Sequence, residues 1–124
     1  LGSASKKART ILRRCDIEHY FDAIVDGTLV SKAKPDPEVF AVGASLLNIS
    51  PADTVVFEDA QAGIEAAVRA GMRAIGGGDP ANLKGADAVI PGFNSFNYAQ
   101  LLAILQCYFL TFCANDCQGS KCGL

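Results

Sequence analysis

Two adjacent carboxylates, Glu58 and Asp59, follow a short run of apolar and β-branched residues, 54–57. Such a run predicts a buried strand, so this acid pair stands where the chain leaves the interior. Neighbouring carboxylates repel each other and lose hydration unless a cation or hydrogen-bond donors offset their charge. Mg²⁺ takes few protein carboxylates and keeps waters and substrate oxygens, so the acid pair fits a magnesium site. Alternatively, Asp59 caps the following helix while Glu58 is solvated, and Asp59 can fill both roles.

Lys34 is the second candidate, because the proline that follows it restricts its backbone. Asp36 can then cap a helix that Pro37 begins, and Glu38 suits the positive end of that helix. A lysine held in this way near a strand end can neutralise a phosphoryl group during transfer. The alternative is an exposed surface lysine without a specific role, which is the commonest environment of this residue type.

The third candidate is a hydroxyl-bearing segment made of Ser3, Ala4, Ser5 and Lys6. It stands between an expected strand end at residues 1–2 and an expected helix over residues 6–14. A hydroxyl, backbone N–H groups and a helix N-terminus together form an anion site. The alternative is a serine that only caps the helix.

The elements that must position these candidates alternate between strands and helices. We expect helices over residues 6–14, 37–47, 60–70 and 97–105, and strands at residues 1–2, 21–25, 54–57, 73–75 and 88–90. Gly71 is expected to end the third helix, and the three glycines 76–78 to break the strand before them. This order predicts a parallel sheet with helices on both faces. Ligands bind such sheets at the carboxyl ends of the strands, where all three candidates are expected.

The composition favours one small globular domain, since the 124 residues are 50% hydrophobic and 19% charged. A net charge of −2 leaves no basic excess to neutralise nucleic-acid phosphates, so no nucleic-acid partner is expected. A small phosphorylated substrate needs only a local cluster of donors. The longest uncharged apolar stretch, residues 101–114, is too short for a membrane span and contains Gln106, so no membrane partner is expected either.

The order of the candidates along the chain resembles the haloacid dehalogenase (HAD) superfamily. Ser3 matches its second motif, Lys34 its third, and the acid pair its fourth. The segment 57–67 is similar to the β-phosphoglucomutase branch, and so are the segments 3–6, 20–25, 34–40 and 85–90. The resemblance covers about residues 1–105 and implies the C-terminal part of an α/β core domain. That core is a Rossmann-like three-layer α/β/α structure with a parallel sheet. The N-terminal strand with the family's nucleophile, and the cap domain that selects the substrate, would precede Leu1.

The resemblance also implies a chemistry for the candidates. In this family a Mg²⁺ ion lies between a nucleophilic aspartate and the fourth-motif acids, and the aspartate becomes phosphorylated. By analogy, Ser3 donates to the phosphoryl group, Lys34 neutralises it, and the acid pair holds Mg²⁺. The substrate-binding residues would be Ser3, Ala4, Ser5, Lys6 and Lys7, with Ser5 and Lys7 along the path of a second phosphate. The mutase converts β-glucose 1-phosphate into glucose 6-phosphate through a glucose bisphosphate.

Three functions remain open at this point. The first is a β-phosphoglucomutase-like isomerase, and the second is a sugar-phosphate phosphatase of the same superfamily. The third, from another class, is a non-catalytic fragment that binds Mg²⁺ or phosphate. We expect the parent protein to be a cytoplasmic, monomeric enzyme with a small phosphorylated sugar as its substrate. The fragment alone is expected to be inactive, because the nucleophilic aspartate is absent from it.

Several positions depart from the family pattern. Asp26-Gly27-Thr28 echoes part of the nucleophile motif but lacks its paired aspartate, and its place matches the loop before Lys34. Lys7 stands where the mutases commonly have asparagine, and Gly77 where a larger apolar residue is usual. Residues 106–124 match nothing in the family, and we expect a foreign, disordered tail. Three of its four cysteines, Cys113, Cys117 and Cys122, lack the paired Cys-x-x-Cys spacing of a zinc site.

Overall fold

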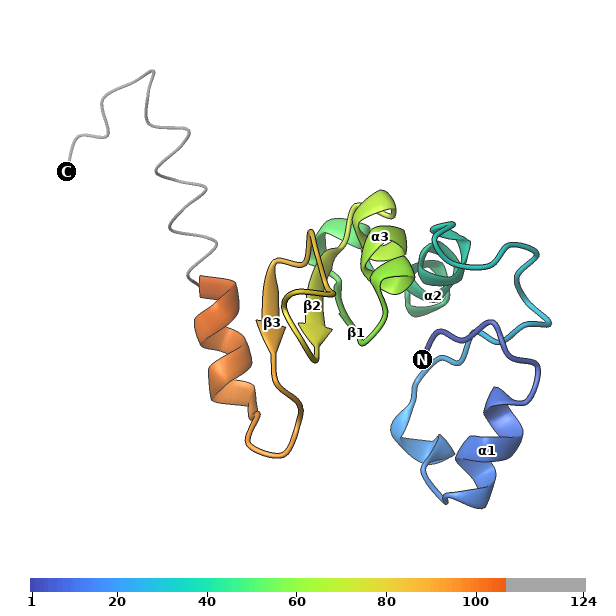
Figure 1. Ribbon diagram of the computed structural model, residues 1–124. Coiled ribbons are helices and arrows are strands. Elements are labelled where there is room, and N and C mark those ends of the chain that lie inside the picture. The colour runs from blue at the N-terminus through green and yellow to red at the C-terminus, as the bar shows by residue number, and fades with distance from the viewer. Residues whose placement is uncertain (107–124) are drawn as a thin grey trace. The chain divides into compact units, whose positions relative to one another are not determined.

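The computed structural model describes residues 1–106 (Figure 1). The chain divides into two compact units, Leu1–Pro91 and Gly92–Leu124. Within the described part of the second unit, a helix spans residues 98–106, close to the expected 97–105. Asn97 and Gln100 exchange side-chain to backbone hydrogen bonds of 2.8 and 3.0 Å, which fix the start of this helix. The predicted cysteine-rich tail lies outside the described residues, apart from Gln106.

The first unit contains a parallel sheet of three strands (Figure 1). Its strands lie in the order β1 (Val55–Glu58), β2 (Arg73–Gly77) and β3 (Ala88–Ile90). The register pairs Glu58 with Gly76, and Gly77 with Ile90. The predicted α/β class with a parallel sheet is therefore confirmed, and the carboxyl end of β1 carries the acid pair.

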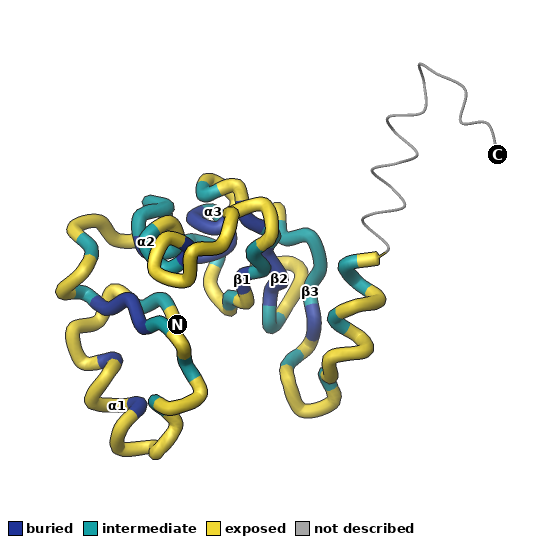
Figure 2. Tube along the Cα trace, turned by 180° about the vertical axis from the view of Figure 1, so that it is seen from behind, coloured by how far each residue is buried: buried dark blue, intermediate teal, exposed yellow. Residues whose placement is uncertain are grey.

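Two helices share the core with this sheet, α2 (Glu38–Leu47) and α3 (Gln61–Arg69). The core cluster contains Ala44, Val56, Ile64, Ala67, Met72, Ala74 and Leu83. Figure 2 shows buried stretches on α3 and the strands, and residues 24–26 form another. Ile64 is completely buried, and such burial stabilises a fold by roughly 2 kcal/mol. Gly71 ends α3 as predicted, with a positive φ of 73° and the Met72 N–H donating to the Ala67 carbonyl.

The N-terminal part differs from the prediction at two places. Helix α1 (Ala8–Arg14) begins two residues later than expected, because residues 3–7 form turns. The predicted strand over residues 21–25 is wrong, since only Val25 pairs, in an isolated parallel bridge with Gly2. The 3₁₀-helix η1 (Glu18–Tyr20) ends at the start of this segment, where the Phe21 N–H donates to the Glu18 carbonyl. A turn at Asp26 follows the segment. Only a short extended stretch remains between these two turns.

Strand β2 continues through glycines that the sequence suggested would break it. Gly76 pairs with Glu58 on one side and with Val89 on the other. A Cβ at Gly76 would lie 2.9 Å from Leu83 Cδ1, so the glycine admits a core side chain rather than ending the strand. The strand does end within the three glycines, at Gly77, but later than predicted, because Gly76 has strand partners on both sides. The 3₁₀-helix η2 (Pro51–Asp53) precedes β1.

Within residues 1–106, no helix combines the length and the apolar character that a membrane crossing requires.

Candidate functional site

The structure brings two of the predicted site residues into direct contact. The ammonium group of Lys34 donates a hydrogen bond to, and forms an ion pair with, a carboxylate oxygen of Glu58. Their side chains are only 21% and 10% exposed, so the pair is largely shielded from water. Lys34 Nζ also lies 4.9 Å from the centre of the Phe40 ring, in a cation–π arrangement. Lys34 is therefore not the exposed surface lysine of the alternative prediction.

The Glu58 side chain lies against α3. A Cβ on Gly63 would stand 2.2 Å from Glu58 Cδ, so a larger residue at this position would displace the carboxylate. Asp59, by contrast, is exposed, and α3 has Ala60 as its N-cap without a side-chain cap bond. The alternative in which Asp59 caps the helix and Glu58 is solvated is thus wrong on both counts. The acid pair instead presents one shielded and one open carboxylate at the end of β1.

The acid pair fits a Mg²⁺ ion by its donor chemistry. Glu58 and Asp59 supply two hard oxygen ligands at a strand end, which is as many as Mg²⁺ commonly takes from protein. No group of three or more histidine, cysteine or acidic side chains in residues 1–106 is arranged to hold a metal. Waters and substrate oxygens would therefore complete the shell of an ion bound here. Lys34 competes for the same Glu58 oxygen, so binding would rearrange the ion pair.

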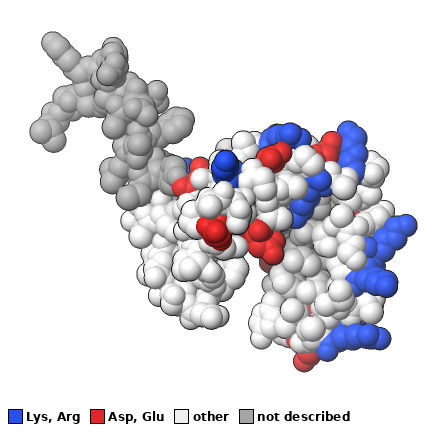
Figure 3. Space-filling view, in the orientation of Figure 1, with Lys and Arg blue, Asp and Glu red and all other residues white. Residues whose placement is uncertain are grey.

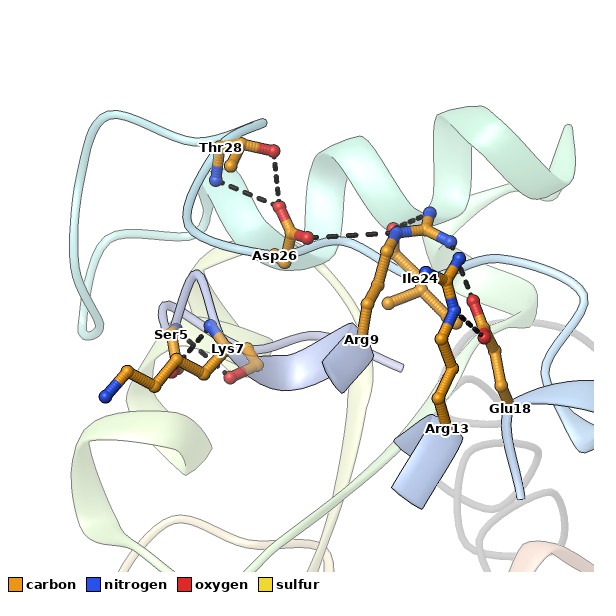
Figure 4. A network of polar contacts seen from close by, with 9 residues as sticks. Ser5, Lys7, Arg9, Arg13, Glu18, Ile24, Asp26 and Thr28 are labelled. Carbon is orange, nitrogen blue, oxygen red and sulfur yellow. Dashed lines mark hydrogen bonds and ion pairs between the residues drawn. The ribbon is translucent and has the colours of Figure 1, made fainter. Parts of the chain in front are cut away.

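The third candidate is a loop of residues 3–7, called the serine loop below (Figure 4). Ser3 Oγ accepts a hydrogen bond from the Ser5 N–H at 3.1 Å, and Ser5 Oγ accepts one from the Lys7 N–H at 3.2 Å. Each hydroxyl keeps its own hydrogen for donation to a ligand. The alternative of a serine N-cap is wrong, because Lys7 occupies the N-cap of α1 without a side-chain cap bond.

The serine loop is set in a basic surface. Figure 3 shows lysine and arginine side chains gathered over the part of the first unit that contains α1. The basic residues of this part are Lys6, Lys7, Arg9, Arg13 and Arg14. In the part of the chain that the structure describes, no hydrogen bond or ion pair joins the serine loop to Lys34 or Glu58. The loop and the Lys34–Glu58 pair are thus separate halves of the predicted site.

Asp26 is a site residue whose role the sequence did not reveal. It is the one buried charged side chain in residues 1–106, with 5% exposure. Its Oδ1 accepts hydrogen bonds from the Thr28 N–H (2.9 Å) and hydroxyl (2.5 Å), and its Oδ2 lies 3.8 Å from Arg9 Nε. The Thr28 bonds, followed by the Arg9 charge, hold the pKa of Asp26 below its ordinary value. Asp26 is thus a structural carboxylate, despite its echo of a nucleophile motif.

Gly27 brings the Asp26 turn against the serine loop. A Cβ at this position would lie 2.2 Å from the Ala4 carbonyl oxygen and 3.1 Å from the Lys6 nitrogen. Both contacts are with backbone, which cannot rotate away as a side chain can. The glycine therefore sets how closely the two segments approach.

Replacing Gly27 by alanine is expected to destabilise the chain by about 1–3 kcal/mol, because the added methyl group overpacks two backbone segments. Denaturant unfolding of the variant measures this loss. The matched control is Gly77→Ala, where a Cβ meets nothing within 4 Å. Equal midpoints for the two variants would contradict the close approach.

Glu38 is a second residue that the sequence assigned only to a helix end. Its Oε2 accepts hydrogen bonds from the backbone N–H groups of Ser31 (2.8 Å) and Lys32 (2.7 Å). The Lys32 bond, and then the Ser31 bond, lower the pKa of Glu38 from its ordinary 4.5. Glu38 therefore ties the segment that leads to Lys34 onto the first turn of α2.

The Glu38→Gln variant is expected to be less stable than the wild type at neutral pH. Because the pKa is lowered in the folded state, the carboxylate contributes stability above its unfolded pKa of 4.5. That contribution is lost as pH falls through the folded value, so the two proteins converge in acid. Unfolding curves at several pH values test this. A difference that stays constant down to acid pH would contradict it, and the exposed Asp53→Asn serves as the control.

Similar proteins place this chain in a family. A sequence profile of haloacid dehalogenase-like hydrolases matches residues 2–76. The chain is 49% identical over 90 residues to a β-phosphoglucomutase of Bacillus subtilis, which covers 73% of this chain and 40% of that protein. It is 46% identical over 76 residues to a phosphorylated carbohydrates phosphatase of Thermotoga maritima, with coverage of 61% and 35%.

The structure gives the same family. A crystal structure of β-phosphoglucomutase from Clostridium difficile superposes with a TM-score of 0.82 at 34% identity, over 86% of this chain and 48% of that one. The chain thus spans less than half the length of each of these three proteins. The profile covers well over half of the residues, and fold and sequence agree. The chain belongs to the haloacid dehalogenase-like hydrolase family.

Proposed function

We propose that this chain is the C-terminal part of the core domain of a magnesium-dependent phosphoryl-transfer enzyme, of the β-phosphoglucomutase type. The observation that carries the proposal is the Lys34–Glu58 contact at the carboxyl end of β1, next to the open carboxylate of Asp59. The ammonium group there can neutralise negative charge on a phosphoryl group, and the two carboxylates can neutralise the positive charge of the accompanying ion. Phosphoryl transfer depends mainly on such positioning and charge neutralisation.

Each residue has a distinct part in this proposal. Lys34 offers its ammonium group to the oxygens of the phosphoryl group, and Phe40 supports the position of its chain. In the serine loop, Ser3 donates its hydroxyl hydrogen to the same group. The acid pair holds Mg²⁺, which when bound polarises the phosphoryl oxygens and offsets their charge. The attacking carboxylate of the family belongs, by the resemblance, to a segment before the residues matched here.

The substrate class is a small phosphorylated sugar. The β-phosphoglucomutase relative favours an isomerase that converts β-glucose 1-phosphate into glucose 6-phosphate. The phosphatase relative supports a second candidate, hydrolysis of a sugar phosphate, because it matches at 46% identity. The two reactions share the site described above and differ in the acceptor, which is sugar in one and water in the other.

The experiment uses the full-length protein, meaning the gene product that carries this chain within a sequence as long as its relatives. It is incubated with β-glucose 1-phosphate and Mg²⁺, and both glucose 6-phosphate and free phosphate are measured. The mutase proposal expects isomer without free phosphate, and the phosphatase proposal expects the reverse. If the folded protein binds Mg²⁺ but forms neither product, the result supports the non-catalytic binding role.

A further inference from the structure

The Asp26-Gly27-Thr28 turn is a conspicuous motif that the proposed reaction does not use. Its carboxylate is buried, fully engaged, and belongs to a loop that contacts the serine loop. We propose that Asp26 is a positioning residue that holds the serine loop in the shape that binds a phosphoryl group. This inference rests on the proposed function, because it assigns a purpose to the same phosphate site.

The start of the serine loop is fixed by the residue before Asp26. Val25 donates its N–H to the Leu1 carbonyl at 2.8 Å, and its own carbonyl accepts from the Ser3 N–H at 2.9 Å. This is the isolated bridge of Val25 with Gly2. The backbone of Ser3 therefore has a set position only as long as the Val25–Asp26 segment has one.

The end of the serine loop is fixed by Arg9, which stands on the first turn of α1. Its guanidinium group lies 3.8 Å from the Asp26 carboxylate, donates to the Ile24 carbonyl at 3.3 Å, and pairs with Glu18 at 3.2 Å (Figure 4). Since α1 continues directly from Lys7, a shift of Arg9 moves the C-terminal end of the loop. One end of the serine loop is thus held by the residue before Asp26, and the other end by Arg9, which pairs with the Asp26 carboxylate.

The middle of the serine loop rests on the residue after Asp26. Gly27 lies so close to Ala4 and Lys6 that no side chain fits between them. The Thr28 hydroxyl and N–H bonds to Asp26 fix the turn that brings Gly27 to this place. Two serine-to-backbone bonds lie within the loop, and a third bond joins the Ala8 N–H to the Ser5 carbonyl, so the rest of its support comes from outside.

A positioning role has a specific kinetic signature. Asp26 lies in the interior, so Asp26→Asn changes no group that touches substrate. Its amide cannot attract Arg9 as a carboxylate does, so the serine loop loses part of its anchor. We expect the Ki of inorganic phosphate and the KM of the sugar phosphate to rise by at least about tenfold, with a smaller change in kcat.

The test compares Asp26→Asn with Arg13→Gln in the full-length protein. Arg13 belongs to the same polar network but bonds only Glu18, at 2.6 Å, and does not reach Asp26. We expect a phosphate Ki close to that of the wild type for Arg13→Gln. Thermal midpoints of all proteins separate a loss of folding from a loss of binding. A folded Asp26→Asn protein with a phosphate Ki within twofold of the wild type would overturn the positioning role.

A second pair of variants covers the case in which Asp26→Asn fails to fold. Thr28→Ser keeps the hydroxyl that donates to Asp26, whereas Thr28→Val removes it at nearly the same volume. If Asp26 is a positioning residue, Thr28→Ser should bind phosphate nearly as the wild type does, and Thr28→Val should bind it more weakly. Equal phosphate Ki values for Thr28→Ser and Thr28→Val would overturn the positioning role. A wild-type protein that neither turns over substrate nor binds phosphate overturns the proposed function as well.

Discussion

Replacing Asp59 by asparagine in the full-length protein is expected to lower magnesium-dependent turnover by about 10²–10³-fold. Asparagine has the same size but no charge, so it weakens the attraction for Mg²⁺ without leaving a void. Asp59 is exposed, and the change in folding free energy should stay within about 0.5 kcal/mol. The loss of turnover would then report on the ion rather than on the fold.

The measurement is turnover as a function of Mg²⁺ concentration. Asp59→Asn should shift half-saturation to higher Mg²⁺ as well as lower the plateau. The matched control is Asp53→Asn, because Asp53 is an exposed carboxylate of η2 just before the amino end of the same strand. It should behave as the wild type. A wild-type Mg²⁺ profile in Asp59→Asn would contradict the assignment of the acid pair.

Replacing Lys34 by methionine is expected to reduce kcat/KM by about 10²–10³-fold, because the ammonium group that offsets phosphoryl charge is lost. Methionine has a similar length but loses the cation over the Phe40 ring and leaves the shielded Glu58 carboxylate without its ion-pair partner. The variant should therefore be less stable than the wild type in the absence of Mg²⁺. Adding Glu58→Gln to Lys34→Met should recover part of that stability, since no unpaired charge remains.

The same variant tests the competition for Glu58. Mg²⁺ should bind Lys34→Met more tightly than the wild type, because the lysine no longer holds the carboxylate oxygen. Thermal shifts over a series of Mg²⁺ concentrations measure this. Lys32→Met is the control, since Lys32 is 66% exposed in its side chain and pairs with Asp36 instead. A weaker Mg²⁺ response in Lys34→Met than in Lys32→Met would contradict the competition.

The sequence predicted well the elements that depend on local chemistry. The apolar run before Glu58 formed β1, and Gly71 ended α3 where a left-handed residue was needed. Helix α2 began at Glu38, one residue after the expected start, and the Asp36 carboxylate accepts from the Glu38 N–H at 3.0 Å. Each of these outcomes rests on residues within a few positions of each other. The family, too, followed from the order of short motifs along the chain.

The sequence failed where a distant partner decided the outcome. The glycines of β2 suggested a break from Gly76 onwards, but Gly76 pairs with Glu58 and Val89 and the strand continues to Gly77. The apolar run over residues 21–25 has strand composition, yet only Val25 meets a partner. Propensity alone cannot supply the neighbouring strand that an extended segment needs.

The sequence by itself therefore determined the candidate residues, their order, and the parallel α/β class that carries them. Only the tertiary structure decided that Lys34 pairs with Glu58, 24 positions away, and that Asp26 is buried between Arg9 and Thr28. The physical reason is that charge pairing and burial depend on distances across the fold. Those distances exist only after the intervening helices and strands have packed. An aspartate in a turn and a lysine before a proline have no fixed environment until then.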